Sequence, residues 1–323
     1  MSKKKIVISL IVVVFLLTGV IFLTTHGKKL GENAILGAKN VDIAHLRCPD
    51  CNVILIGVDT LRADHLSSYG YFRDTSANIN TFTQKGIMFK NAYSQAGKTT
   101  PSFMSIFTSL YPTDHGILSV LFSDPGEIPL VKINDNVQTL AQILKAHGYA
   151  TYGMVTSSQL PPELGFSRGF DEFTGGTVKE KRDDLLTLLT KLQSQKFFVF
   201  FHDMMTHGPY VPPEPYDRLY DSSYNGKIIL DDYREITEIL SEDPIDHLND
   251  SIQVKIEKIR RNSEIVAATY WSNVNPNDSR DIEYLKALYD GEIKHLDDFI
   301  GDLQKVLADT NLLEKTIIIF TAD

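Results

Sequence analysis

Residues 53–58 form an apolar run, Val-Ile-Leu-Ile-Gly-Val, that has no polar side chain and ends abruptly at Asp59. A strand with one face in water alternates apolar and polar residues, whereas a strand covered on both faces does not. The run therefore predicts a buried parallel strand, which requires helices on both sides of its sheet. Further apolar runs at 149–155, 197–201 and 317–320 each follow a helical pattern. We predict an α/β fold built on a mostly parallel sheet flanked by helices.

One amphipathic helix is predicted before the last of these runs. Its apolar side chains recur at three- and four-residue steps and form one buried stripe: Leu296, Phe299, Ile300, Leu303, Val306 and Leu307. The region between 217 and 280 is more polar and contains a charge cluster at Glu257, Lys258, Arg260 and Arg261. Such a cluster is typical of a solvated helix, so we predict a helical excursion from the sheet here and not a ligand site.

The composition excludes several classes of protein. The 323 residues contain 32 Lys and Arg against 41 Asp and Glu, and the net charge of −9 argues against a nucleic-acid partner. With 43% hydrophobic and 23% charged residues, the chain has the composition of a folded globular protein. Its two cysteines, Cys48 and Cys51, form a lone Cys-x-x-Cys motif. Since zinc would need two more ligands at matching spacing, we predict a local disulfide.

The N-terminus predicts attachment to a membrane. Three lysines at 3–5 precede an almost continuous apolar run at 6–23, which is long enough to span a bilayer as a helix. Positive charge before the run favours a cytoplasmic N-terminus. We predict a single-pass transmembrane helix in the cell membrane with an extracytoplasmic globular domain; a cleaved signal peptide is the alternative. The predicted parts are an anchor or signal segment at 1–27, a linker at 28–51 and a domain at 52–323.

Acidic and imidazole side chains occur where three predicted strands end. Asp59 follows the first strand, Asp323 follows the last, and the strand between them is followed by His202, Asp203 and His207. Parallel strands bring their carboxyl ends to one edge of the sheet, where ligands bind in such folds. A single Asp at a strand end is usually a turn or helix cap, but several that converge suit a cation. We predict a site for Ca²⁺, Mg²⁺, Mn²⁺ or Zn²⁺ at this edge.

A second candidate is the segment Lys98-Thr99-Thr100-Pro101-Ser102. Pro101 suits the first turn of a helix, with Thr100 as its N-cap. The start of that helix offers free N–H groups and the positive end of its dipole to an anion. Both threonines can be simple capping residues. Alternatively, Thr99 is a nucleophile whose hydroxyl pKa is lowered by a metal.

Several segments together resemble one known family. Residues 52–66 read Asn-Val-Ile-Leu-Ile-Gly-Val-Asp-Thr-Leu-Arg-Ala-Asp-His-Leu and are followed by Tyr69-Gly70. The likeness continues in order through 91–93, 99–102, 110–116, 165–171, 207–210, 289–293 and the final Phe-Thr-Ala-Asp at 320–323. This set resembles the sulfatase family of the alkaline phosphatase superfamily, and it covers nearly everything from Asn52 onward.

The resemblance implies an alkaline-phosphatase-like fold and hydrolysis of sulfate or phosphate esters at a metal centre. Asp59 and Asp323 fall on metal-ligand positions. Thr99 falls on the nucleophile position, which also contacts the metal, and His207 falls on a histidine that contacts the transferring group or its leaving oxygen. Alternatively, Asp203 and His207 bind a second metal, as in two-metal phosphodiesterases. The implied substrates are sulfated or phosphorylated glycans, lipids or small-molecule esters.

The chain departs from the family pattern at several positions. Sulfatases carry Cys or Ser at the nucleophile, which is oxidised to formylglycine, and Arg four residues later; here these residues are Thr99 and Phe103. Because oxidation of a threonine gives a ketone, formylglycine chemistry is not expected. Leu110 occupies the position of a second arginine of the family. Thr60 occupies the position of the second Asp of the opening metal pair. A threonine nucleophile instead resembles phosphodiesterases and the membrane-anchored phosphoglycerol or phosphoethanolamine transferases of the superfamily.

Two expectations concern completeness and activity. The family places His-Gly directly after the residue that corresponds to Asp323, so we expect a catalytic domain that is incomplete at its C-terminus. A catalytically inactive binding ectodomain is the alternative from another functional class. Phe103 and Leu110 favour that alternative, whereas it is opposed by the presence of Asp59, Thr99, His207 and Asp323.

Overall fold

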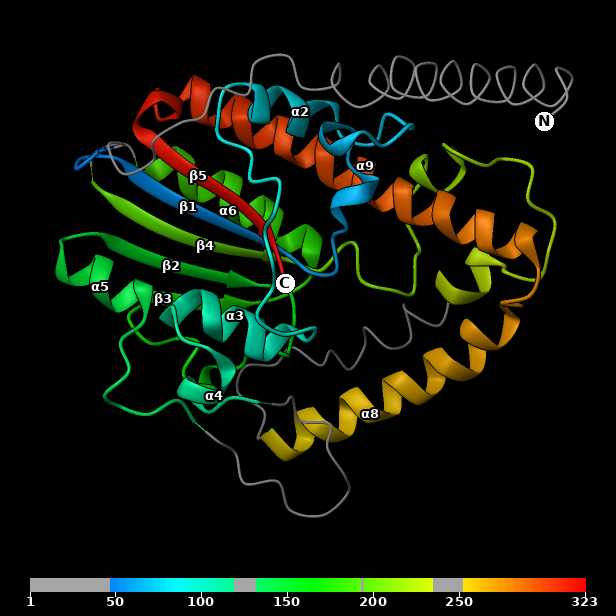
Figure 1. Ribbon diagram of the computed structural model, residues 1–323, viewed down its shortest axis with the longest axis horizontal. Helices are drawn as coiled ribbons and strands as arrows, with labels where there is room; N and C mark the ends of the chain where they lie inside the picture. The colour runs from blue at the N-terminus through cyan, green and yellow to red at the C-terminus, as the bar shows by residue number, and fades with distance from the viewer. Residues whose placement is uncertain (1–46, 119–131, 193–194, 235–251) are drawn as a thin grey trace, which may run out of the picture. The chain divides into compact units, whose positions relative to one another are not determined.

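A computed structural model describes residues 47–118, 132–192, 195–234 and 252–323 (Figure 1). The residues from Cys48 to Asp323 form one compact unit. The predicted transmembrane helix lies outside the described residues. Among the helices that are described, none combines the length and apolarity needed to cross a bilayer.

Five strands form a single parallel sheet in the described part of the chain, in the order β3-β2-β4-β1-β5. They are β1 (Asn52–Val58), β2 (Ala150–Val155), β3 (Glu172–Gly175), β4 (Phe197–Asp203) and β5 (Thr316–Ala322). The sheet confirms the predicted fold class, and the four apolar runs correspond to β1, β2, β4 and β5. The edge strand β3 was not predicted, because its sequence Glu-Phe-Thr-Gly has a single apolar side chain.

Helices cover both faces of the sheet (Figure 1). One face carries α3 (Thr99–Thr108), α4 (Pro112–His115) and α5 (Leu140–Ala146). The other carries α2 (Ala77–Gln84), α6 (Val178–Lys191) and the long α9 (Ser279–Asp309). The remaining helix of the described residues, α8 (Ile252–Thr269), lies in the polar region where we predicted a helical excursion.

The alternation along β1 divides the core into two layers. Ile54, Ile56 and Val58 pack in the cluster with α6 and α9, whereas Leu55 packs in the cluster with α3 and α5. On the α3 face, Gly57 is required by close packing, because a Cβ there would lie 2.2 Å from the Phe103 ring. The predicted α9 stripe is confirmed: its members all contact the first cluster, with Val306 partly buried.

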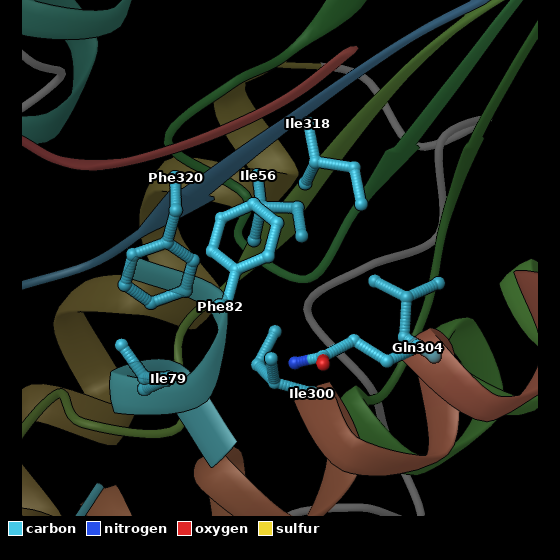
Figure 2. A pocket seen from close by; sticks show the side chains of 8 residues that line it. Ile56, Ile79, Phe82, Ile300, Gln304, Ile318 and Phe320 are labelled. Carbon is cyan, nitrogen blue, oxygen red and sulfur yellow. The ribbon is translucent and has the colours of Figure 1, made fainter. Parts of the chain in front are cut away.

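A small apolar hollow lies between the sheet, α2 and α9 (Figure 2). Its lining consists of Ile56, Ile79, Phe82, Ile300, Leu303, Gln304, Ile318 and Phe320. None of these side chains is titratable or nucleophilic, so the hollow is a packing feature of the core. Before β1, Cys48 and Cys51 form the predicted disulfide.

Candidate functional site

The carboxyl ends of β1, β4 and β5 bring the predicted acidic residues to one edge of the sheet. In the parallel register, Val58 of β1 lies beside Asp203 of β4 and Ala322 of β5. The next residues along these strands therefore include Asp59 and Asp323. The backbone N–H of Asp59 donates to the carbonyl of Asp203 at 2.9 Å, which extends the ladder by one step. The convergence expected from parallel strands is present.

Asp59 and Asp323 form a pair of adjacent carboxylates. The Asp59 side chain is 1% exposed. Burial raises the pKa of Asp59 to about 8, and the charge of Asp323 and a hydrogen bond between the two carboxyl groups add to this shift. Two anionic groups in a desolvated place repel each other unless a proton or a cation is shared between them. At neutral pH the pair therefore holds a proton, which a bound cation could replace.

Thr99 places its hydroxyl beside this pair. The residue is buried and opens α3, and its Oγ1 lies 3.3 Å from Oδ2 and 3.5 Å from Oδ1 of Asp59. The N-cap of α3 is Lys98, so the prediction of Thr100 as the cap was wrong: the Thr100 hydroxyl donates to the carbonyl of Gln159 instead. The first turn of α3 presents its N–H groups and dipole end where Thr99 stands.

His202 lies on the same face as Asp59 and Thr99. It is fully buried, with its ring edge-on to Phe103, and burial lowers its pKa to about 4. Its Nδ1 is 3.4 Å from the hydroxyl of Thr156. The other ring nitrogen, Nε2, has no hydrogen-bond partner in the described structure and lies 3.8 Å from Oδ2 of Asp59. A neutral imidazole with an unpartnered nitrogen therefore faces the carboxylate pair.

Asp203 has a different environment from Asp59. Successive side chains of a strand point to opposite faces, so Asp203 points away from His202 and toward α6. There Arg182 donates from Nε to Oδ2 of Asp203 at 2.8 Å, and both side chains are buried. The other oxygen of Asp203 accepts from the backbone N–H of Met205. Asp203 is thus neutralised within the fold, and the second-metal role proposed for it with His207 stays a prediction.

His207 follows β4 in a loop and is half-buried. Its Nδ1 lies 2.7 Å from the carbonyl of Gly208. His207 therefore stands a few residues beyond the C-terminal end of β4, at the same sheet edge as His202. Among the described residues, no group of three or more His, Cys, Asp and Glu side chains is arranged as a complete metal site.

Comparison with known proteins defines the family. The sulfatase family model matches residues 51–323. The chain belongs to the sulfatase family. Its relatives include N-acetylgalactosamine-6-O-sulfatase of Bacteroides thetaiotaomicron, 33% identical over 31% of this chain and 19% of that protein. Iduronate 2-sulfatase of Mus musculus is 23% identical over 84% of this chain and 54% of that protein.

Solved structures of the superfamily share the fold. Phosphonate monoester hydrolase of Agrobacterium radiobacter superposes with a TM-score of 0.58 and 17% identity, over 84% of this chain and 62% of that one. A protein solved with its substrate D-glucosamine-2-N,6-O-disulfate gives 0.55 and 16%, over 84% and 65%. The chain thus spans less than two thirds of the length of these relatives. The departures from the family pattern remain. Phe103, which stands where sulfatases have an arginine, is fully buried in the core and packs against Gly57.

Some residues of the site were not found from the sequence. Thr60, after Asp59, has a φ of 53°, a left-handed conformation that costs a non-glycine residue about 1–2 kcal/mol. Its N–H donates to Oδ1 of Asp323 at 2.9 Å. Arg182 lies in a run of charged residues that resembles a solvated helix face, so nothing in the sequence showed that it is buried. In neither case does the local sequence carry the signal.

Proposed function

We propose that this protein is a metal-dependent, extracytoplasmic hydrolase of sulfate or phosphate esters that uses Thr99 as its nucleophile. The observation that carries the proposal is the Thr99 hydroxyl at 3.3 Å from Asp59, whose carboxylate lies beside that of Asp323. Membership of the sulfatase family supports the same reaction class. We further propose that residues 1–27 tether the domain to the cell membrane as a single-pass anchor.

The residues present fit a divalent cation. Asp59 and Asp323 supply hard oxygen ligands whose mutual repulsion a cation would remove, and the unpartnered Nε2 of His202 faces them. We infer that Asp59, Asp323 and Thr99 would hold Ca²⁺, Mg²⁺, Mn²⁺ or Zn²⁺. When bound, such an ion lowers the pKa of a coordinated hydroxyl and stabilises negative charge on sulfate or phosphate oxygens.

The chain's own residues then account for an in-line displacement. The Thr99 hydroxyl gives its proton to the neighbouring Asp59 carboxylate, and Oγ1 forms a bond to sulfur or phosphorus while the bond from that atom to the leaving ester oxygen breaks. The N–H groups at the start of α3 stabilise the equatorial oxygens. His207 donates a proton to the leaving oxygen. Water then cleaves the covalent ester on Thr99, which regenerates the hydroxyl and releases sulfate or phosphate.

The threonine at position 99 also favours a second candidate function, group transfer to an alcohol, which uses the same mechanism. Since a threonine cannot yield the formylglycine aldehyde, the covalent intermediate is an ordinary ester of Thr99. Such an ester can pass its group to an alcohol instead of water, as in a phosphoglycerol- or phosphoethanolamine-type transferase. Phosphodiesters then become substrates alongside sulfate esters.

The substrates we propose are sulfated or phosphorylated glycans, lipids or small-molecule esters. Trp271, the chain's one tryptophan, supports a sugar in this role. Its side chain is 39% exposed and packs against Gly208, directly beside His207. A partly exposed indole near His207 suits contact with the apolar face of a sugar ring.

A metal-by-substrate assay tests the proposal. The purified protein is stripped with EDTA and given each of the four metals with 4-nitrophenyl sulfate, 4-nitrophenyl phenylphosphonate or bis(4-nitrophenyl) phosphate. We expect turnover that requires metal and falls by at least about 10³-fold in Thr99→Ala. The control is Thr100→Val, which removes the neighbouring hydroxyl but should retain turnover. Full activity of Thr99→Ala would exclude Thr99 as nucleophile, and no turnover under any condition would favour a binding ectodomain.

A further inference from the structure

The turn after β1 is held by an unusual set of contacts around Thr60. Its φ of 53° is rare for a β-branched residue, so the surroundings must hold it there. Its hydroxyl donates to the carbonyl of Thr206 at 2.6 Å, and the Thr206 hydroxyl donates back to the carbonyl of Asp59 at 2.6 Å. This conformation aims the N–H of Thr60 at Asp323, at 2.9 Å from Oδ1. The turn thus joins the two carboxylates of the site.

Tyr289 of α9 clamps this turn from the other side. Its hydroxyl donates to the carbonyl of Thr60 at 2.9 Å and accepts from the N–H of Arg62 at 2.8 Å. One phenol therefore fixes the backbone on both sides of Leu61. Tyr289 is 5% exposed, and burial raises its pKa, so the hydroxyl stays protonated and able to donate.

The next residue of α9 anchors the segment that continues from the turn. Asp290 is fully buried and accepts hydrogen bonds from His65 Nδ1 at 2.7 Å, Tyr71 Oη at 2.8 Å and Arg73 at 2.6 Å. The His65 ring also packs edge-on against Tyr289. Two successive residues of one long helix therefore hold the chain from Thr60 to Arg73. This rigid support is what a strained turn needs.

We propose that Tyr289 is a positioning residue of the metal site: its hydroxyl holds Thr60 in the left-handed conformation that keeps Asp323 beside Asp59. The inference rests on the proposed metal site and goes beyond it, because Tyr289 touches neither carboxylate. Without the phenol hydroxyl, the turn relaxes toward an ordinary φ, the Thr60 N–H leaves Asp323, and the carboxylate pair loses its geometry.

The test compares Tyr289→Phe with Tyr149→Phe. The two hydroxyls are matched, since Tyr149 donates to the carbonyl of Cys51 at 2.9 Å, just before β1 begins. Manganese affinity is measured by isothermal titration calorimetry. We expect Tyr289→Phe to weaken binding about 10–100-fold, as loss of a group that orients metal ligands does, and Tyr149→Phe to bind as wild type. Equal affinities in the two variants would overturn the inference.

Two further readouts separate this inference from the proposed function. In metal-free protein, hydrogen exchange at the amides of Thr60 and Arg62 should accelerate in Tyr289→Phe but not in Tyr149→Phe; unchanged exchange would refute the clamp. In a Thr60→Gly background, where a positive φ carries no steric cost, Tyr289→Phe should weaken manganese binding less than it does in wild type. An equal loss in both backgrounds would also refute it. If wild type binds no metal, the metal site fails, while the exchange data still decide on the clamp.

Discussion

Asp59 and Asp203 end neighbouring strands, and both carboxylates are almost fully buried, with exposed fractions of 1% and 0%. Their partners differ. Asp203 meets a buried arginine, Arg182, at 2.8 Å, and the two charges cancel within the fold. Asp59 meets a second carboxylate, Asp323, and burial, reinforced by the charge of Asp323, raises its pKa to about 8. The acidic residue at the end of β4 is therefore neutralised by an arginine of the chain. The acidic residue after β1 has no such partner among the described residues and would be neutralised by a bound cation.

This difference predicts which acidic residue at this edge of the sheet would gain from a bound cation. A buried ion pair within the chain balances its own charge, so Asp203 gains no neutralisation from an added cation. Two adjacent carboxylates with a hydroxyl beside them cost free energy in the absence of a cation, and that cost is recovered only on binding. The position of an Asp at a strand end does not by itself show whether it is neutralised. Asp59 and Asp203 point to opposite faces of the sheet, and the partners on those faces differ.

The largest effect is expected from breaking the pair at Asp203. Asp203→Asn leaves the Arg182 guanidinium buried without a counter-charge, which should lower the free energy of unfolding by about 3–5 kcal/mol. Urea denaturation measures this loss. The double variant with Arg182→Met removes both charges and should recover much of the stability. If Asp203→Asn unfolds at the wild-type midpoint, Asp203 is not neutralised by Arg182 as the contact indicates.

Metal addition should have the next largest effect, and this effect should require Asp59. A divalent ion at 100 times its Kd stabilises the folded protein by about 2.7 kcal/mol. We expect this gain in wild type and its absence in Asp59→Asn, measured by thermal unfolding with and without the ion. Asp64→Asn is the control, since Asp64 lies on the same turn but is exposed and paired with Arg62. An equal gain in Asp59→Asn would place the metal elsewhere.

The fold and the acidic edge could be predicted because both depend on local pattern. An apolar run without alternation indicates a buried strand, and parallel strands share one carboxyl edge, so the meeting of Asp59 and Asp323 follows from topology. Thr99 was found because Pro101 and the family motif mark a helix start. The short strand β3 escaped prediction because so few apolar residues identify it.

The remaining features depend on contacts between distant segments. Arg182 lies 21 residues from Asp203 and appears in a run of charged residues that resembles a solvated face. The left-handed φ of Thr60 follows from hydrogen bonds to Thr206 and to Tyr289, 229 residues away. The residues next to Arg182 and Thr60 in the sequence do not indicate these contacts, because the contacts depend on how distant segments pack in this fold.

Removal of the ionisable group of Asp59 should stabilise the metal-free protein. Asp59→Asn keeps the size of the side chain but removes the carboxyl group that the folded state must hold protonated at pH 7, so the free energy of unfolding in EDTA should rise by about 1–2 kcal/mol. Asp203→Asn should have the opposite sign, which makes the two variants a direct test of the comparison. A decrease in the stability of Asp59→Asn would mean that Asp59 has a favourable partner in the absence of metal.

The last effect is a slope with pH, which is smallest when it is expressed per pH unit. In metal-free protein the pKa of Asp59 is raised from 3.8 to about 8, so between these values the folded state binds more protons than the unfolded state. Stability should therefore fall as pH rises through this window, by at most about 1.4 kcal/mol per pH unit from this group. The measurement is the difference in slope between wild type and Asp59→Asn from urea unfolding in EDTA at pH 5, 6, 7 and 8. Saturating metal should flatten the wild-type slope, because a bound cation replaces the proton. A slope that is the same in both proteins, with or without metal, would contradict the view that the folded state holds Asp59 protonated until a cation binds.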